Sequence, residues 1–168
     1  MAPPVVITYL EINDPADLIP PAQEPRNEFE IEWVDEPEVN RWFYERVGAD
    51  YGWADHVDWS DERWSSWAGD VETWEMTSGT ERAGYFELRQ TGETIHIEHF
   101  GLVPRFHGVG LGGELLAAAI RRGFELGSRV TVETASTDGP YALDNYLARG
   151  MRMVRRRIRD DSRRVAGR

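Results

Sequence analysis

The sequence predicts one mixed α/β domain, in which a twisted and mostly antiparallel sheet is flanked by helices. Three short runs rich in β-branched and aromatic residues follow one another with glycine-containing turns between them, which is typical of an antiparallel meander. A glycine-rich turn and a helix then separate two further strands, and such a crossover joins parallel strands. The length of 168 residues and the apolar fraction of 40%, with seven tryptophans, suit a single globular core.

Two strands and two helices are predicted before residue 70. Residues 5–10 are β-branched and aromatic, and in residues 29–33 apolar side chains alternate with glutamate, which indicates a strand with one buried face. Pro37 is typical of a helix start and Gly48 of a helix end. Ser60 is a candidate N-cap for a second helix.

The meander strands are predicted at residues 73–76, 83–88 and 94–100, with turns at 78–80 and 91–93. After the glycine-rich turn, one apolar stripe and a glycine C-cap define the next helix, and two further strands enclose a short helix. The stripe is Leu116, Ile120 and Phe124, the C-cap is Gly127, the two strands are 129–134 and 151–158, and the short helix contains Tyr146.

The glycine-rich turn is the strongest functional signal. Glycine occupies positions 108, 110, 112 and 113 between a strand and a helix. Glycines allow positive φ and a close approach of backbone amides to a ligand, and a helix N-terminus adds unpaired N–H groups and a positive dipole end. The turn therefore predicts a phosphate or diphosphate site.

A dinucleotide-binding turn is one interpretation of this motif. Residues 108–113 satisfy G-x-G-x-x-G, and Glu133 follows at a suitable interval for a ribose ligand. Residues 104–107, however, separate the glycines from the strand end. Too little chain also follows Glu133 for the further strand-helix units of that fold, so this interpretation is disfavoured.

The order Leu102-Val103-Pro104, His107-Gly108-Val109-Gly110-Leu111-Gly112 and Glu114-Leu115-Leu116 resembles the signature of the GNAT superfamily of acyl-CoA-dependent N-acyltransferases. In that family a strand runs into V-x-P, then Q/R-x-x-G-x-G/A, then a helix. His107 stands where the family usually has Gln or Arg, so the backbone contribution to the diphosphate contact is retained and the side-chain contribution is altered. A second similarity is A-x-x-x-Y-x-x-x-G, carried by Ala142, Tyr146 and Gly150 and followed by Met151 in place of Phe.

The resemblance covers about residues 70–155 and implies a GNAT fold with two parallel strands diverging at the acyl-CoA site. It implies direct acetyl transfer from acetyl-CoA to an amine, without a metal or an enzyme nucleophile. The expected organisation is an acceptor-binding part at 1–70, an acyl-CoA-binding core at 71–158 and a basic tail at 159–168. The expected coenzyme contacts are Leu102, Val103, His107, Gly108, Val109, Gly110, Leu111, Gly112, Gly113 and Asn145.

Two proton-transfer residues are expected. Tyr146 is suited to protonate the leaving thiolate, since a phenol is protonated at neutral pH. Glu98 is the first choice of base because the family often places a carboxylate on this strand, and its competitors are His99, His96 and Glu87. Strand alternation places Glu98 and His99 on opposite faces unless a bulge intervenes.

Charge and composition restrict the partners. A formal net charge of −11 disfavours nucleic acid and favours a cationic acceptor, although residues 152–168 are basic. Aromatic and acidic residues suit an ammonium group, and the expected acceptor contacts are Trp53, Asp55, His56, Trp59 and His99. The absence of cysteine excludes a thiol nucleophile and a thiolate metal site.

No long apolar run or basic-then-apolar leader is present, so a cytoplasmic protein without membrane contact is expected. A homodimer is compatible with the sequence. Two alternatives stay open at this point: a catalytically idle acyl-CoA-binding module, and an acetyltransferase that acts on protein N-termini or lysines.

Overall fold

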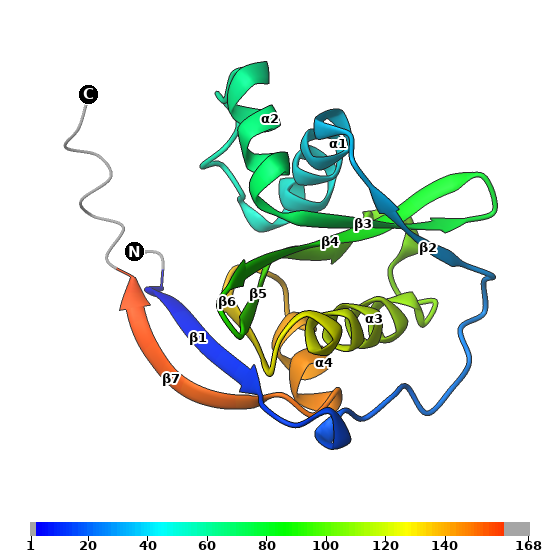
Figure 1. Cartoon of the computed structure of the whole chain (residues 1–168), viewed down its shortest axis with the longest axis vertical. Helices are drawn as coiled ribbons and strands as arrows, with labels where there is room; N and C mark the ends of the chain where they lie inside the picture. The colour runs from blue at the N-terminus through cyan, green and yellow to red at the C-terminus, as the bar shows by residue number, and fades with distance from the viewer. Residues whose placement is uncertain (1–2, 160–168) are drawn as a thin grey trace.

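One seven-stranded mixed sheet, ordered β2-β3-β4-β5-β6-β1-β7, runs through the computed structural model, which describes residues 3–159 (Figure 1). The strands are β1 (Val5–Ile12), β2 (Glu30–Val34), β3 (Glu72–Ser78), β4 (Glu81–Thr91), β5 (Thr94–Leu102), β6 (Arg129–Ala135) and β7 (Arg152–Arg159). The helices are α1 (Pro37–Gly48), α2 (Asp61–Asp70), α3 (Leu111–Leu126) and α4 (Ala142–Ala148), with 3-10 turns at Pro15–Asp17, Ala49–Tyr51 and Pro104–Phe106.

The predicted meander and crossover are both confirmed. Strands β3, β4 and β5 pair antiparallel, with turns in which Gly79 and Gly92 take φ values of +62° and +61°. Strand β6 pairs parallel to β5 after the α3 crossover. Ser60 accepts a hydrogen bond from the Arg63 amide as the N-cap of α2, and Gly127 is the C-cap of α3.

Strand β1 lies between β6 and β7 and pairs antiparallel with both. The start of the described chain is thereby placed against its end, as Figure 1 shows at the β1–β7 pair. This position is not predicted from the sequence, because it depends on contacts between residues more than 100 positions apart.

Strands β5 and β6 separate after a short parallel ladder. Their pairing runs from Thr94 with Arg129 to Ile97 with Val132, although β5 continues to Leu102. At the same point β5 carries a bulge against β4, because Glu87 pairs with His99 while Leu88 pairs with Ile97. A bulge leaves one residue unpaired and bends its strand. The bulge and the separation together open a gap in the sheet at residue 98.

Helices cover both faces of the central strands. Helices α1 and α2 lie on one side of β3–β5, and α3 and α4 lie on the other (Figure 1). Residues 83–88 of β4 are consequently all buried, as expected for a strand covered on both faces. Phe43 of α1 stacks on Tyr85 with ring centroids 4.8 Å apart, while Leu115 and Ile120 of α3 are fully buried on the opposite side.

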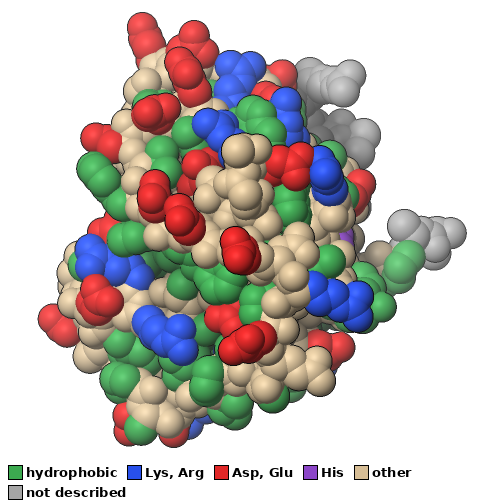
Figure 2. All heavy atoms as spheres, turned by 90° about the vertical axis from the view of Figure 1, so that its right-hand side faces the viewer, with side chains coloured by type: hydrophobic (Ala, Val, Ile, Leu, Met, Phe, Trp, Pro, Cys, Tyr) green, Lys and Arg blue, Asp and Glu red, His purple; other side chains and the backbone are tan. Residues whose placement is uncertain are grey.

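The surface carries both signs of charge. Figure 2 views the side that lies on the right in Figure 1, where acidic side chains are spread over the surface with basic and hydrophobic ones between them. The predicted basic tail falls almost wholly on residues 160–168, which lie outside the described part of the chain.

Candidate functional site

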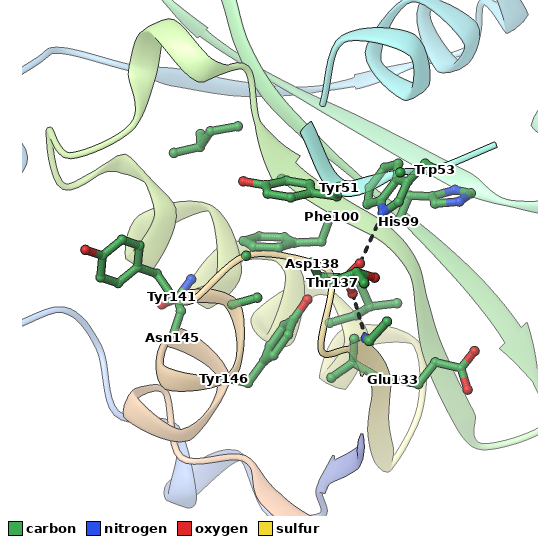
Figure 3. A pocket seen from close by; sticks show the side chains of 18 of the residues that line it. Tyr51, Trp53, His99, Phe100, Glu133, Thr137, Asp138, Tyr141, Asn145 and Tyr146 are labelled. Atoms are coloured by element: carbon green, nitrogen blue, oxygen red, sulfur yellow. Dashed lines mark hydrogen bonds between the residues drawn. The ribbon is translucent and has the colours of Figure 1, made fainter. Parts of the chain in front are cut away.

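A cavity of about 770 Å³ lies where β5 and β6 separate. It extends from the glycine-rich turn to the loop between α1 and α2, and Figure 3 shows the side chains that surround it. Among the predicted site residues, its walls include Trp53, Asp55, His56, Glu98, His99, Leu102, His107, Gly108, Gly112, Gly113, Asn145 and Tyr146. Val103, Val109, Gly110, Leu111 and Trp59 are not part of the walls.

The glycine-rich turn presents backbone amides at the start of α3. Gly108 and Gly110 have φ values of +75° and +87°, in the left-handed region that favours glycine. Within residues 3–159, the amides of Gly108 and Val109 have no hydrogen-bond partner. The first amides of α3 also lack intrahelical acceptors, as in any helix. This arrangement of N–H groups suits an anionic group.

Two of the four glycines in the turn face protein rather than open space. A Cβ added at Gly110 would lie 3.2 Å from Cα of Pro25, and one at Gly113 would overlap Nη1 of Arg149. A Cβ at Gly108 would meet nothing within 4 Å, and one at Gly112 would make ordinary 3.7 Å contacts. The absence of a side chain at Gly110 therefore lets the segment around Pro25 pack against the turn. At Gly108 and Gly112 the absence of a side chain leaves space in the cavity.

The free edge of β5 faces the gap with its backbone groups. The Val103 amide donates to the Ala83 carbonyl of β4 at 2.8 Å. Because residues in an antiparallel ladder alternate between facing the partner and facing away, the N–H and C=O groups of Leu102 and Phe100 point away from β4. These groups are therefore available to an extended ligand. Nε2 of His107 lies 3.1 Å from the Leu102 carbonyl and occupies one of these positions.

Other predicted coenzyme contacts have structural partners. Leu111 is fully buried in the core, and Val103 is 8% exposed. The carbonyl of Val109 accepts a hydrogen bond from the Arg26 amide. Asn145 donates from Nδ2 to the Gly112 carbonyl at 3.1 Å, so it holds α4 against the first turn of α3.

Tyr146 projects from α4 into the cavity wall with 6% of its surface exposed (Figure 3). Its ring lies 6.0 Å from that of Phe100 on β5. Burial raises the pKa of the Tyr146 phenol well above its ordinary value, and the charge on Asp138 raises it further. The phenol is therefore protonated at neutral pH and available as a donor.

His99 is hydrogen-bonded to a fully buried carboxylate. Its Nδ1 lies 2.5 Å from Oε1 of Glu87, which is 0% exposed. Oε2 of Glu87 accepts from Nδ2 of Asn40 at 2.5 Å and from Nε1 of Trp67 at 2.9 Å. The amide and indole N–H groups only donate, and the carboxylate oxygen accepts from both. The other carboxylate oxygen accepts from His99, so a neutral His99 carries its proton on Nδ1. Nε2 is then the basic nitrogen.

Glu98 and His99 both line the cavity, because the bulge breaks the alternation of β5. The two side chains differ in their partners, since Glu98 forms an ion pair with Nε of Arg89 at 2.8 Å. His96 lies on the part of β5 that pairs with β6, and its Nδ1 is 2.8 Å from Oγ1 of Thr131. His96 is not part of the cavity wall.

An aromatic stack forms the acceptor end. The ring of His56 lies 4.7 Å from that of Tyr44 and 3.5 Å from that of Trp59, nearly parallel to both. Trp59 also lies under the guanidinium of Arg63, at 4.6 Å, so it packs behind His56 rather than in the cavity wall. Burial, and then the charge of His99, lowers the pKa of His56 to about 4.

The loop that follows β6 is not predicted from the sequence as part of the site. Asp138 accepts from Nε1 of Trp53 at 3.3 Å and from Oγ1 of Thr134 and the Ala135 amide at 2.9 and 2.8 Å. This loop and the α1–α2 loop therefore meet at the cavity, as the dashed line between Trp53 and Asp138 in Figure 3 indicates. The available signal was the Thr-Asp-Gly-Pro run at 137–140, a turn that directly follows a strand.

Within residues 3–159, no group of three or more His, Asp or Glu side chains could hold a metal ion. No helix in this range is long and apolar enough to cross a membrane.

Comparison with known proteins identifies the family. The model of the acetyltransferase (GNAT) family matches residues 25–151. The chain therefore belongs to the GNAT family of acetyltransferases, whose acyl donor is acetyl-CoA. The family and the fold predicted from the sequence are confirmed.

Solved structures with the same fold share little sequence. A GCN5-related N-acetyltransferase from Kribbella flavida has a TM-score of 0.65 at 16% identity, covering 92% of this chain and 58% of its own. A Bacillus subtilis acetyltransferase in complex with CoA has a TM-score of 0.58 at 22% identity, covering 73% and 76%. An aminoglycoside acetyltransferase from an uncultured soil metagenomic sample, in complex with sisomicin, has a TM-score of 0.59 at 14% identity, covering 69% and 83%.

Several of the matched structures have longer chains than this protein. The chain spans 51–62% of the length of the Kribbella protein and three others. Comparison with curated proteins returned no match.

Proposed function

We propose that the protein transfers the acetyl group of acetyl-CoA to a primary amine of a small, cationic acceptor bound in the cavity. One observation carries the proposal: a single cavity joins the start of α3, the free backbone edge of β5, and the side chains of Tyr146 and His99. Phosphate-binding, extended-chain-binding and proton-transfer groups therefore share one continuous space, as a transfer between two bound molecules requires.

The coenzyme half of the proposal rests on backbone groups. The amides of Gly108 and Val109 and those of the first turn of α3 would bind the diphosphate. The Leu102 carbonyl and the groups of Phe100 that face the gap would pair with the pantetheine amides, as an added strand does. His107 would give up its contact with the Leu102 carbonyl when that pairing forms.

The base in this proposal is His99, oriented by Glu87, in place of Glu98. Glu87 fixes the Nδ1 proton of His99 and leaves Nε2 as a lone-pair donor in a cavity-lining side chain. Glu98 is already engaged in an ion pair with the guanidinium of Arg89, so this pair would have to be broken before Glu98 could contact the amine. The assignment to Glu98 made from the sequence stays an untested alternative.

The acid is Tyr146, as expected from its motif. The amine nitrogen attacks the thioester carbonyl, His99 Nε2 takes the amine proton, and the N–H of Leu102 donates to the oxyanion. The C–S bond then breaks and Tyr146 donates its proton to the leaving sulfur. The products are the N-acetylated amine and free CoA. His99 then releases the proton that it took from the amine, and Tyr146 regains one, by exchange with solvent.

The cationic acceptor is supported by the acidic and aromatic side chains of the cavity. Asp55, Glu133 and Asp138 line it together with Tyr51 and Trp53. Carboxylates and aromatic faces attract ammonium groups. The fold relative that was solved with sisomicin is described as an aminoglycoside acetyltransferase, so aminoglycosides are a rational part of an acceptor screen.

The remaining expectations stay predictions. They are the division at residues 70 and 158, the cytoplasmic location and the possible homodimer. Of the front part, Ile7 of β1, Tyr44 and residues 51–56 line the cavity, and β1 lies in the sheet between β6 and β7.

A thiol-release screen tests the proposal. The protein is incubated with acetyl-CoA and diamines, aminoglycosides, arylalkylamines, or peptides with free N-termini or lysines, and free CoA is measured. Release that depends on a small cationic amine is the expected result. Acetyl-CoA should also raise the melting temperature by mass action. Binding without release for any amine would contradict the proposed activity and favour an idle module, and release only with peptides would contradict the proposed acceptor.

A further inference from the structure

The two ends of the sheet carry opposite charges. Strand β7 forms one end and β2 the other (Figure 1). Five of the eight residues of β7 are arginine, whereas β2 and its flanks are acidic. The acidic residues are Glu28, Glu30, Glu32, Asp35 and Glu36. Each end strand pairs on one side only among the described residues, so each leaves a row of backbone N–H and C=O groups unpaired.

Three consecutive arginines in the middle of β7 lack acidic partners. Arg152 contacts Glu11, but within residues 3–159 Arg155, Arg156 and Arg157 have no carboxylate within 4.0 Å. Arg155 lies over the ring of Tyr9 at 4.2 Å, and Arg157 donates to the hydroxyl of Tyr9 at 2.8 Å. The strand is exposed on both faces. Its exposed apolar side chains are Met153, Val154 and Ile158, at 47%, 56% and 67%.

The acidic end is also electrostatically unbalanced. Glu32 lies directly opposite Glu75 in the β2–β3 ladder, an arrangement that destabilises a sheet. Burial, and then the charges of Glu36 and Glu32, raises the pKa of Glu75 even though Arg82 lies 3.0 Å away. Trp33 of β2 is 58% exposed. A positively charged neighbour would relieve this repulsion.

The charges select one pairing. Charged side chains at a sheet edge prevent pairing with a like-charged edge, so β7 disfavours a second β7 and β2 a second β2. Only β2 against β7 brings opposite charges together. The ladders of the sheet also make β2 and β7 run in opposite directions, so a second copy placed in line would continue the sheet with an antiparallel pair.

We propose that β7 of one copy pairs with β2 of a second copy, so that the chain associates head to tail through its oppositely charged sheet ends. The interface joins two different surfaces and leaves one of each free, so it produces open chains that lengthen with protein concentration. This inference does not depend on the acetyl-transfer proposal.

Sedimentation at two salt concentrations is the first test. At several hundred micromolar protein and about 20 mM salt, the weight-average mass should be at least about twice that of the monomer. At about 500 mM salt it should return to the monomer mass, since added salt screens exposed charges. A monomer at both salt concentrations would overturn the proposal.

Two charge-reversal variants make the test specific. Glu30→Arg with Glu32→Arg replaces both acidic side chains of β2 by basic ones, and Arg155→Glu with Arg156→Glu places two acidic side chains in the middle of β7. Each variant alone should be monomeric at low salt, and an equal mixture should associate again. Recovery in the mixture also shows that both variants are folded.

Asp58→Arg with Glu62→Arg is the matched control, because both residues are exposed and lie away from the sheet ends. It makes the same change in net charge as the β2 variant and should associate like the wild type. The proposal is overturned by association of either reversal variant alone, or by a mixture that stays monomeric while the wild type associates.

Discussion

Nδ1 of His99 lies 2.5 Å from Oε1 of Glu87, and Glu87 is completely buried beneath α1 and α2. Asn40 of α1 and Trp67 of α2 donate to the other carboxylate oxygen. The helices that cover the sheet therefore also orient a histidine at the cavity. A buried carboxylate is costly unless it is fully hydrogen-bonded, so these hydrogen bonds fix the positions of Glu87 and its three partners.

Substitution of His99 tests the proposed base. His99→Gln should lower kcat about 100-fold, because a positioned base contributes on this scale. Glu87→Gln should lower kcat at least about tenfold. Asn40 and Trp67 require the amide oxygen at the Oε2 position, so the amide nitrogen would face Nδ1 of His99 and could not accept its proton. Steady-state kinetics with a saturating amine provide the measurement.

Glu98→Gln separates the two candidate bases. If His99 is the base, this variant keeps kcat within about threefold of the wild type, because only the ion pair with Arg89 is lost. A large loss in Glu98→Gln together with a small one in His99→Gln would reverse the assignment.

Tyr146→Phe should separate binding from chemistry. The phenol is buried in the cavity wall, and phenylalanine fills nearly the same space, so acetyl-CoA affinity should stay within about twofold. The value of kcat should fall about 100-fold because the thiolate then leaves without an acid. Calorimetric titration and turnover measured on the same preparation decide the point, and unchanged turnover removes Tyr146 from the mechanism.

Gly112→Ala tests the cavity wall at the start of α3. The added Cβ makes only ordinary 3.7 Å contacts with Asn145 and Leu102, so the melting temperature should change little. It narrows the cavity beside the amides, and acetyl-CoA affinity should fall about tenfold, a difference of ~1.4 kcal/mol. Gly69→Ala in α2 is the matched control, because its Cβ meets nothing within 4 Å and should leave affinity unchanged. Equal affinity in both variants would argue against a ligand at Gly112.

His56 makes stability depend on pH. Burial, and then the charge of His99, lowers its pKa from 6.5 to about 4. The unfolded chain thus binds this proton at a higher pH than the folded chain does. Above about pH 6.5 the neutral His56 leaves the free energy of unfolding at its full value. As the pH falls towards 4 this free energy decreases by about 2 kcal/mol, after allowance for the partial exposure of His56.

The variant His56→Phe isolates this effect, because phenylalanine keeps the stack with Tyr44 and Trp59 but does not titrate. Urea denaturation at pH 7 and pH 4.5 should show a smaller loss of stability in the variant than in the wild type. Identical losses would mean that other groups cause the acid sensitivity.

The local pattern of the sequence predicts most of the fold. Alternating strands, glycine turns and the α3 crossover depend on neighbouring residues, and these predictions are confirmed. The position of β1 between β6 and β7 depends on long-range pairing, which no local signal reports. The close approach of Pro25 to Gly110 is also long-range, so the sequence offers no means of telling this glycine from Gly108.

The sequence predicts where the site lies but not which side chains contact one another there. The sequence indicates the cavity side of β5, yet the choice between Glu98 and His99 depends on a bulge that only the ladder with β4 reveals. Trp59 has the composition of an acceptor contact but packs against His56 outside the wall. Asp138 was missed because an Asp in a turn usually bonds to its own backbone, whereas this one also contacts Trp53.

A crystal structure of the protein with CoA is the most direct test of the central proposal. The account predicts the diphosphate on the amides between Gly108 and Gly113, and the pantetheine arm along Leu102 and Phe100 with its sulfur beside Tyr146. An empty cavity at saturating CoA, or a coenzyme bound away from the start of α3, would contradict it.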